Sequence, residues 1–157
     1  MEKTPSESKV EWFKVIQTED INASDRLFGG RLLAWMDEVA GIAAIRHSGH
    51  NVTTAAIDSL RFKKGLYLGD LVVIESRVTY VGNTSMEVRV DVYREDVSTS
   101  LRYPVNRAFF TEVCIDENGN PVKVPFELKI ESENERADWE GAKLRIKNRK
   151  ERNLQGF

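Results

Sequence analysis

The chain has 157 residues, 41% of them hydrophobic and 31% charged, which is the composition of an ordinary globular domain with room for a core. Its net charge of −2 excludes a strongly basic surface for nucleic acid or for an anionic membrane. No apolar run approaches the roughly 20 residues of a membrane span, and a single cysteine, Cys114, excludes an internal disulfide. Since the first ten residues also lack the apolar core of a signal peptide, we expect a cytoplasmic protein that neither binds nucleic acid nor inserts into a membrane.

The first third of the chain is predicted to form a strand, a loop and a long helix. Residues 11–18 alternate between polar and apolar side chains, as a half-buried strand does, and residues 19–28 are mostly polar. From about Gly30 to His47 the apolar residues recur at helical spacing. Gly49 follows and is suited to the left-handed turn that commonly ends a helix.

After the helix the apolar period changes to two, which predicts strands. Within residues 71–81 the pattern puts Val72, Ile74, Val78 and Tyr80 on one face. The next residues, Gly82-Asn83-Thr84, are typical of a tight hairpin turn. The four expected strands cover residues 52–62, 71–81, 86–92 and 105–115. One strand, one helix and four further strands with antiparallel-type turns predict an α+β domain.

The C-terminal tail is predicted to be a charged helix from about Ser132 to Leu154, acidic in its first half and basic in its second. That order suits the helix dipole, so the tail is either a solvated helix or one whose basic end reaches an anionic ligand. We expect residues 1–10 to be a flexible N-terminus, 11–126 one domain and 127–157 the tail. A single long helix cannot cover both faces of a five-stranded sheet, and we therefore expect a homo-oligomer.

One carboxylate of the predicted helix lies on its apolar side. Counting about 100° per residue from Leu33, Met36 lies near −60°, Ala40 near −20° and Asp37 near +40°, whereas Glu38 points away at about 140°. A lone carboxylate among apolar side chains costs several kcal/mol unless it is compensated. Asp37 therefore either caps a loop that packs over the helix or takes part in chemistry.

Other common catalytic sites are not indicated. The two histidines, His47 and His50, have no cysteine or carboxylate cluster at the spacing of a metal site. There is no G-x-S-x-G motif, and Cys114 has no base in its sequence context, which disfavours a covalent hydrolase. We interpret His47, at the predicted helix end, as a partner of the helix dipole.

In order and spacing, the motifs together resemble those of the hotdog-fold acyl-CoA thioesterases, in the subgroup that acts on cytosolic fatty acyl-CoAs. The resemblance covers roughly Lys14 to Arg149. Its parts are Asn22 followed seven residues later by Gly29, then F-G-G at 28–30, W-M-D-E-V-A-G at 35–41, Arg46-His47, Val52-Thr53, Ile57-Asp58, Phe62, Gly69-Asp70, Thr84-Ser85-Met86, Ala108-Phe109-Phe110-Thr111 and the basic tail. It implies a five-stranded antiparallel sheet wrapped around the long helix, edge-to-edge dimers with sites at their interface, and trimers of such dimers.

The resemblance assigns the catalytic roles to Asp37, as general base, and to Asn22, the two meeting across a dimer interface. Backbone N–H groups around Gly30 and Arg31, at the positive end of the helix, would hold the oxyanion. Gly29 beside them would let the substrate approach the backbone closely. Many relatives have a glycine between the asparagine and F-G-G where this chain has Asp25, which puts substrate preference in doubt more than reaction type.

The resemblance also implies a binding site for coenzyme A, as part of the substrate and not as a cofactor. Its expected residues are a strand edge that bonds the pantetheine amides, the start of a strand after the hairpin, and a basic residue near the phosphates: Ala55, Ala56 and Ile57; Thr84, Ser85 and Met86; and Arg145. Ordinary sheet pairing is the alternative for the first two groups, and several neighbouring basic residues compete with Arg145.

We therefore expect an acyl-CoA thioesterase in which water attacks the thioester with help from Asp37. The first alternative is a hotdog dehydratase or hydratase, but those relatives use a carboxylate–histidine pair, and residues 22–41 hold no histidine. The second is a non-catalytic acyl-CoA sensor, which has no need of a carboxylate beside the thioester. Turnover of palmitoyl-CoA with detection of the free thiol separates these readings.

Overall fold

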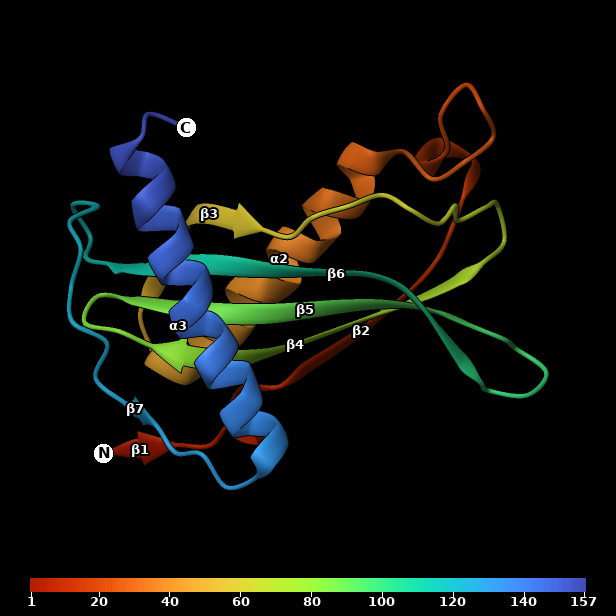
Figure 1. The fold of residues 1–157 in the computed structure, drawn as a ribbon. Coiled ribbons are helices and arrows are strands. Elements are labelled where there is room, and N and C mark those ends of the chain that lie inside the picture. The colour runs from red at the N-terminus through yellow and green to blue at the C-terminus, as the bar shows by residue number, and fades with distance from the viewer.

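A long helix, α2 (Gly29–Ser48), lies against one face of a five-stranded antiparallel sheet in the computed structural model, which describes residues 1–157 (Figure 1). Across the sheet the strands are β2 (Val10–Val15), β4 (Leu71–Val81), β5 (Ser85–Glu95), β6 (Arg102–Ile115) and β3 (Asn51–Asp58). The expected α+β architecture of one helix and five strands is confirmed. Neither long helix has an apolar stretch sufficient to cross a membrane.

The core lies between α2 and the sheet. On the sheet it is formed by the alternate residues of the central strands, among them Val72, Ile74, Val88, Val90 and Phe110. On α2 the buried residues are Leu32, Trp35, Met36, Val39, Ala40, Ala43, Ala44, His47 and Ser48. This arc is wider than the predicted stripe and does not centre on Leu33, because α2 contacts all five strands of the sheet and the N-terminal helix as well. Asp37 therefore lies at the boundary of the core and is half-buried.

A β-bulge in β4 changes the predicted faces of that strand. Val78 pairs with Val88, but the next pair is Tyr80 with Glu87, so one residue of β4 is left over. Such an extra residue reverses the side-chain alternation after it. The prediction that Tyr80 shares a face with Val78 is therefore wrong. Tyr80 instead packs on Trp139 on the other side of the sheet, with ring centroids 5.8 Å apart.

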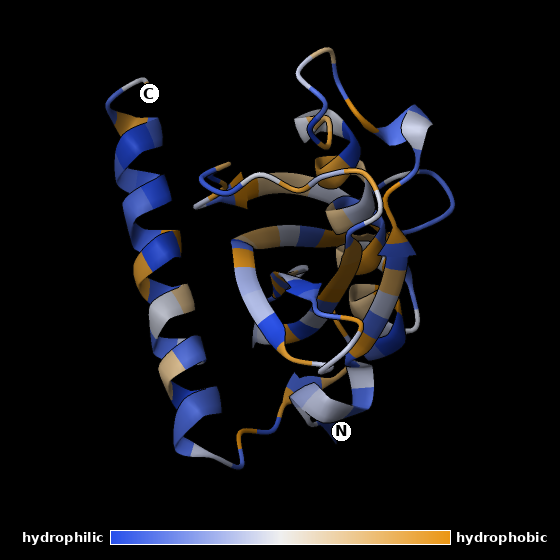
Figure 2. Ribbon diagram, turned by 90° about the vertical axis from the view of Figure 1, so that its right-hand side faces the viewer, coloured by the Kyte–Doolittle hydropathy of each residue, from blue (hydrophilic) through white to orange (hydrophobic).

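The second long helix, α3 (Glu133–Leu154), covers the face of the sheet opposite α2 (Figure 2). It begins where predicted, with Ser132 as N-cap accepting from the N–H of Glu135. Asp138 forms ion pairs with Arg77 and Arg89, both at N–O distances of 2.7 to 2.8 Å. The tail is therefore not simply solvated, because it covers the sheet face that a single long helix leaves open. Charged side chains of the strands pair with charged side chains of the helix instead.

Residues 1–10, expected to be flexible, form regular structure. β1 (Glu2–Lys3) pairs in parallel with β7 (Glu127–Leu128), and α1 (Pro5–Ser8) follows it. The backbone N–H of Thr4 donates to the Glu7 carboxylate at 2.6 Å, and Lys3 Nζ donates to the carbonyl of Arg46 at 2.9 Å. These contacts join the N-terminus to the end of α2 and to the segment before α3. The segments on either side of the expected boundaries at residues 10 and 126 are thus in contact.

Three predicted element ends also shift. β2 ends at Val15 because residues 18–20 form the 3₁₀ helix η1 (Thr18–Asp20), in which the Asp20 carboxylate accepts from the N–H of Gln17 at 2.8 Å. β3 ends at Asp58 because Ser59 has φ 66°, which breaks the extended backbone. β6 begins at Arg102, three residues earlier than predicted. The alternation of polar and apolar residues, from which the strands were predicted, does not reveal tight turns that depend on single residues.

His47 is not a charged partner of the helix dipole, as we had interpreted it. The ring is fully buried, its Nε2 lies 3.0 Å from the carbonyl oxygen of Phe126, and burial lowers its pKa. A neutral imidazole with Nε2–H donating to that carbonyl satisfies the contact. His47 thus holds the chain before β7 against the end of α2.

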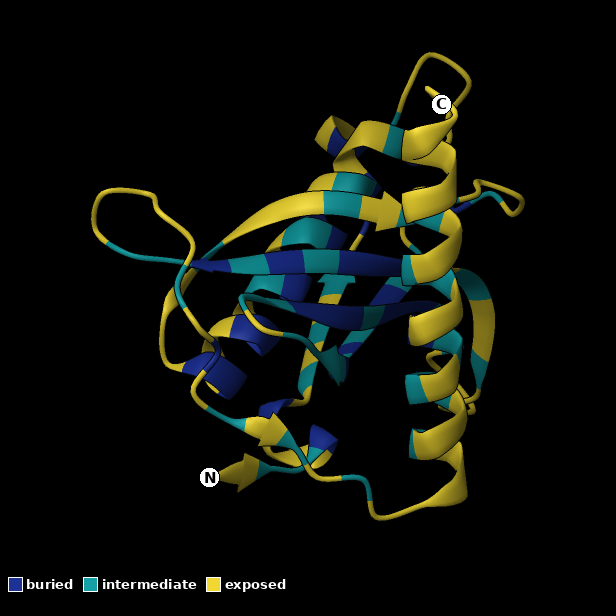
Figure 3. Cartoon of the chain, turned by 60° about the vertical axis from the view of Figure 1, so that its left-hand side comes forward, coloured by how far each residue is buried: buried dark blue, intermediate teal, exposed yellow.

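The strand β3 lies at one edge of the sheet and has β6 as its only neighbour. Its residues are largely exposed, in contrast to the buried central strands (Figure 3). Ala55 is the extra residue where the register with β6 shifts between Thr54 and Ala56. This strand therefore presents both a free backbone edge and the side chains that face α2.

Candidate active site

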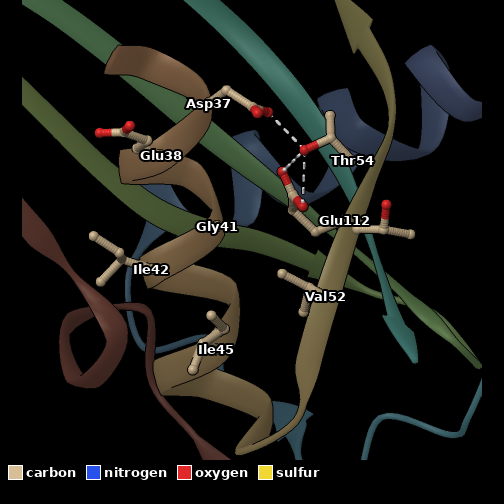
Figure 4. Close-up of a pocket in the computed structure, with 9 residues that line it drawn as sticks. Asp37, Glu38, Gly41, Ile42, Ile45, Val52, Thr54 and Glu112 are labelled. Carbon is tan, nitrogen blue, oxygen red and sulfur yellow. Dashed lines mark hydrogen bonds between the residues drawn. The ribbon is translucent and has the colours of Figure 1, made fainter. Parts of the chain in front are cut away.

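Asp37 faces a cavity of about 650 Å³ between α2 and β3 (Figure 4). Part of the cavity wall is apolar and consists of Ile42 and Ile45 of α2 and Val52 of β3, next to Gly41. The acidic end of the cavity consists of Asp37, Thr54 and Glu112. The remaining residues of the wall are Glu38 and Thr53. The site therefore combines a carboxylate with a neighbouring apolar surface.

Thr54 fixes the orientation of Asp37. Its hydroxyl Oγ1 lies 2.6 Å from Asp37 Oδ1 and donates to it (Figure 4). The sequence reasoning did not select Thr54. A signal was present, because Val52 and Thr54 are two residues apart on a strand and so share the face toward α2. The bulge directly after Thr54 ends that alternation and leaves Thr54 as its last member.

Glu112 is a second carboxyl group at the acidic end and was also missed. It lies on β6 between Phe110 and Cys114 on the face toward α2, and only 1% of it is exposed. Thr54 Oγ1 lies 3.0 and 3.2 Å from its two carboxyl oxygens. Burial, together with the negative charge of Asp37, raises the pKa of Glu112 to about 7. A glutamate in the alternating series Ala108, Phe110, Cys114 was the sequence signal for this buried acid.

Asn22 lies in a different cavity of the same chain. This cavity has a volume of about 330 Å³, and Asn22 shares it with Gly29 and Phe62. The side-chain oxygen of Asn22 accepts from the backbone N–H groups of Ser24 and Arg26, at 2.9 and 3.2 Å, so its amide nitrogen is available to a ligand. Within one chain the structure does not bring Asn22 and Asp37 together.

Asp25, where many relatives have glycine, adopts the left-handed backbone conformation with φ 59°. Aspartate tolerates this region better than most residues, although glycine does so at lower cost. The loop that carries Asn22 therefore keeps the backbone shape that a glycine would give.

The start of α2 offers a different pair of backbone donors from the expected one. The carbonyl of Phe28 accepts from the N–H of Arg31 at 2.9 Å and from that of Leu32 at 3.1 Å. Arg31 was expected to hold the oxyanion, but its N–H is thus already used within the helix. The N–H groups of Gly29 and Gly30 have no intramolecular partner, because the first turn of a helix has no preceding carbonyls. Gly30 therefore remains a donor candidate, together with Gly29.

The second of these glycines lies against the ring of Phe28. A Cβ at Gly30 would lie 2.7 Å from a ring carbon of Phe28, whereas one at Gly29 would make ordinary contact with Phe62 at 3.5 Å. Gly30 is thus the position at which a side chain forces the Phe28 ring to move.

Two of the residues expected to bind coenzyme A meet at a third cavity. Ile57 at the end of β3 and Arg145 of α3 line a space of about 500 Å³, together with Arg61 and Arg152. Ala55 is exposed at the bulge, while Ala56 pairs with Thr111 in the sheet.

The residues after the hairpin have structural roles in the chain. The carbonyl of Thr84 accepts from the N–H of Cys114 at 2.9 Å, and that of Ser85 from the N–H of Gly82 at 2.8 Å. Met86 is 1% exposed and its side chain belongs to the hydrophobic core, so the expected contact with the coenzyme stays a prediction that only its backbone could fulfil. Alternation along β5 turns its side chain toward α2.

Arg145 is held by a buried ion pair. Its guanidinium donates to both carboxyl oxygens of Glu87, at 3.0 and 2.7 Å, and lies over the ring of Phe109. Glu87 is 3% exposed and also accepts from the hydroxyl of Thr79 at 2.8 Å. Arg145 thus fastens α3 to the sheet in addition to lining the cavity near Ile57.

Arg145→Ala should therefore lower the free energy of unfolding by about 3 kcal/mol, because it leaves the Glu87 carboxylate buried without its cation. Urea denaturation at a fixed protein concentration measures this change. Lys147→Ala is the matched control, since Lys147 is exposed on the same helix and should shift the value by no more than about 0.5 kcal/mol. A raised KM for acyl-CoA with unchanged stability would contradict the anchoring role and favour a purely electrostatic one.

Comparison with known sequences identifies the family of the chain. The family model of the thioesterase superfamily matches residues 25–100. YkhA of Bacillus subtilis, an uncharacterized acyl-CoA thioester hydrolase, is 40% identical over 128 residues, which are 78% of this chain and 74% of that protein. The cytosolic acyl coenzyme A thioester hydrolase of rat is 35% identical over 144 residues; these are 90% of this chain but only 38% of the longer rat protein.

Solved structures agree. An acyl-CoA hydrolase of Staphylococcus aureus, determined with butyryl coenzyme A and coenzyme A, superimposes with a TM-score of 0.92 at 33% identity over 99% of this chain and 94% of that chain. Alanine variants of that enzyme have been solved for an asparagine, for an aspartate 15 residues later and for a threonine a further 17 residues later. An apo-hexameric acyl-CoA thioesterase superimposes with a TM-score of 0.91 at 36% identity over 97% of both chains.

The two solved structures match nearly the whole chain, and the identity to YkhA extends over three quarters of either protein. These likenesses confirm the expected hotdog fold and the family that the sequence motifs indicated. The protein belongs to the acyl-CoA thioester hydrolases of the thioesterase superfamily.

Proposed function

We propose that the chain hydrolyses acyl-CoA thioesters at the acidic end of the cavity between α2 and β3. The observation that carries this is the hydrogen bond of 2.6 Å by which Thr54 orients Asp37 beside an apolar surface. Asn22, Asp37 and Thr54 are separated by 15 and 17 residues, the same separations as the three substituted residues of the Staphylococcus aureus enzyme. A carboxylate, its orienting hydroxyl and an amide therefore recur with the same spacing.

In the proposed reaction, Asp37 accepts a proton from a water molecule as the water oxygen bonds to the thioester carbonyl carbon. The charge that develops on the carbonyl oxygen is stabilised by the N–H groups of Gly29 and Gly30 and by the amide of Asn22. The carbon–sulfur bond then breaks, and the coenzyme A thiolate leaves and takes a proton from Asp37. The products are a carboxylic acid and coenzyme A, and the reaction requires no further cofactor.

The two halves of this site come from different copies of the chain in our proposal. Asp37 and Asn22 line separate cavities, and β3 has a free backbone edge next to Thr54. Pairing of β3 with the same strand of a second copy would satisfy this edge. The hexamer of the similar thioesterase supports a trimer of such dimers as the assembly.

The remaining assignments follow from the cavities. The apolar end with Ile42, Ile45 and Val52 receives the start of the acyl chain. Arg152, which is half exposed and pairs with Asp58 at 3.1 Å, lines the cavity near Ile57 with Arg145 and is the residue we propose to contact the phosphates of coenzyme A. A buried, unpaired Cys114 fits the reducing cytoplasm, where we place the protein.

The test is turnover of acyl-CoA thioesters from butyryl- to palmitoyl-CoA, with detection of released thiol. We expect thiol release in step with fatty acid formation. Release of no thiol, with binding of acyl-CoA retained, would favour the non-catalytic sensor. Addition of water to a 2-enoyl-CoA without thiol release would favour the hydratase, although no histidine lines the cavity.

A further inference from the structure

Glu112 is a buried acid whose role the proposed reaction does not yet explain. It has no lysine, arginine or histidine partner, and its one hydrogen-bonding neighbour is the hydroxyl of Thr54. Replacement by an apolar residue would avoid the cost of burying it. Its position between two residues of the core therefore calls for a reason in the chemistry of the site.

If Asp37 and Glu112 are both ionised, the hydroxyl of Thr54 carries the only hydrogen for hydrogen bonds among the three side chains. Thr54 Oγ1 lies 2.6 Å from Asp37 and 3.0 and 3.2 Å from the two oxygens of Glu112. A hydroxyl carries one hydrogen and cannot donate to both carboxylates at once. A protonated Glu112 would remove the conflict, because its O–H would donate to Thr54 Oγ1 and leave the hydroxyl hydrogen of Thr54 for Asp37.

We propose that Glu112 is a positioning residue of this reaction: its protonated carboxyl group donates to Thr54, and Thr54 in turn holds Asp37 in the orientation of the general base. The inference rests on the proposed role of Asp37 and adds a requirement on a residue that does not touch the substrate. The positioning transfers no proton between Glu112, Thr54 and Asp37. Thr54 Oγ1 accepts one hydrogen bond, from Glu112, and Asp37 accepts one, from Thr54.

The charge environment indicates the pH at which this arrangement fails. Asp37 and Glu38 on α2 are the charged groups that share the cavity with Glu112. On its own strand Cys114 faces the same side, and on β5 its pair is the uncharged Met86. Burial and the charge of Asp37 raise the pKa of Glu112 to about 7. Above that pH Glu112 ionises, competes for the hydrogen of Thr54 and places a second negative charge beside Asp37.

The experiment compares kcat for butyryl-CoA from about pH 6 to pH 9 in the unchanged protein and four variants, namely Glu112→Gln, Glu112→Leu, Thr54→Val and the double variant of the last two. For the unchanged protein, kcat should fall by about tenfold toward pH 9, as expected when a required acid loses its proton. Glu112→Gln keeps a donor but cannot ionise, so its kcat at pH 6 should stay within about threefold of wild type and should not fall toward pH 9. Glu112→Leu lacks the donor and should have kcat about tenfold lower throughout, the loss of roughly one hydrogen bond.

Thr54→Val tests whether Glu112 acts on Asp37 through the hydroxyl of Thr54. If Glu112 acts through Thr54, the double variant Thr54→Val with Glu112→Leu should have the same kcat as Thr54→Val alone. A ¹³C NMR titration of the glutamate carboxyl groups gives an independent readout, in which one signal should titrate near pH 7 and be absent from Glu112→Gln.

The inference would be overturned if kcat of Glu112→Gln still fell toward pH 9. It would also be overturned if Glu112→Leu lowered kcat by the same factor in the unchanged protein and in Thr54→Val. Neither result bears on Asp37 as the base. If the unchanged protein and Glu112→Gln both release no thiol from butyryl- to palmitoyl-CoA, the proposed function itself is wrong. The NMR titration then still reports whether Glu112 is the protonated acid.

Discussion

Asp37→Asn should lower kcat for acyl-CoA hydrolysis by at least about 100-fold, the usual contribution of a positioned general base. Asparagine keeps an oxygen that accepts the hydrogen bond from Thr54, so the fold and the position of the side chain should be preserved. What it loses is the ability to take a proton from water. The measurement is thiol release at saturating substrate, with the assembly checked by light scattering.

A matched control neutralises a carboxylate elsewhere. Glu140→Gln removes the same charge from an exposed position on α3 and should leave kcat within about twofold. A second readout is internal to the site: since the negative charge of Asp37 helps to raise the pKa of Glu112, that pKa should fall in Asp37→Asn. A variant that retains more than about a tenth of the wild-type kcat has an activation free energy raised by less than about 1.4 kcal/mol. That result would exclude the role of Asp37 as base.

Asn22→Ala and Asn22→Asp should each lower kcat by about 100-fold, as the loss of one group that stabilises the oxyanion does. The pair separates two roles of Asn22. Aspartate keeps the oxygen that accepts from Ser24 and Arg26 and so keeps the loop, but it lacks the amide donor. Near-normal activity of Asn22→Asp would show that Asn22 matters only for the shape of its loop.

Mixing the two inactive proteins tests whether the site is shared between copies. After subunit exchange, a dimer of Asn22→Asp and Asp37→Asn chains has one interface site with both changes and one with neither, so part of the activity should return. Each variant incubated with itself is the control. If subunit exchange is verified and no activity returns, the interface site is contradicted. It is also contradicted if light scattering shows that the unchanged chain is a monomer.

The sequence determined those features that depend on local periodicity. The spacing of apolar residues located α2 and most of the strands, and the separation of acidic and basic residues located α3 with its cap at Ser132. Asp37 was found because a helix has a fixed angle per residue, so a carboxylate near an apolar stripe is visible without coordinates. Asn22 and Gly30 were selected by the order and spacing of the family motifs.

Only the tertiary structure decided which side chains meet. Thr54 and Glu112 come from strands that are neighbours in the sheet but distant in the chain, and their register depends on the bulge after Thr54. The bulge in β4 likewise moved Tyr80 to the face of α3, and the ion pair with Glu87 held Arg145 there. Sheet register and the pairing of buried charges are long-range interactions, and the pattern of a single segment carries no information about its partner. The sequence therefore located Asp37, whereas the folded chain determined that the hydroxyl of Thr54 lies between Asp37 and the buried Glu112.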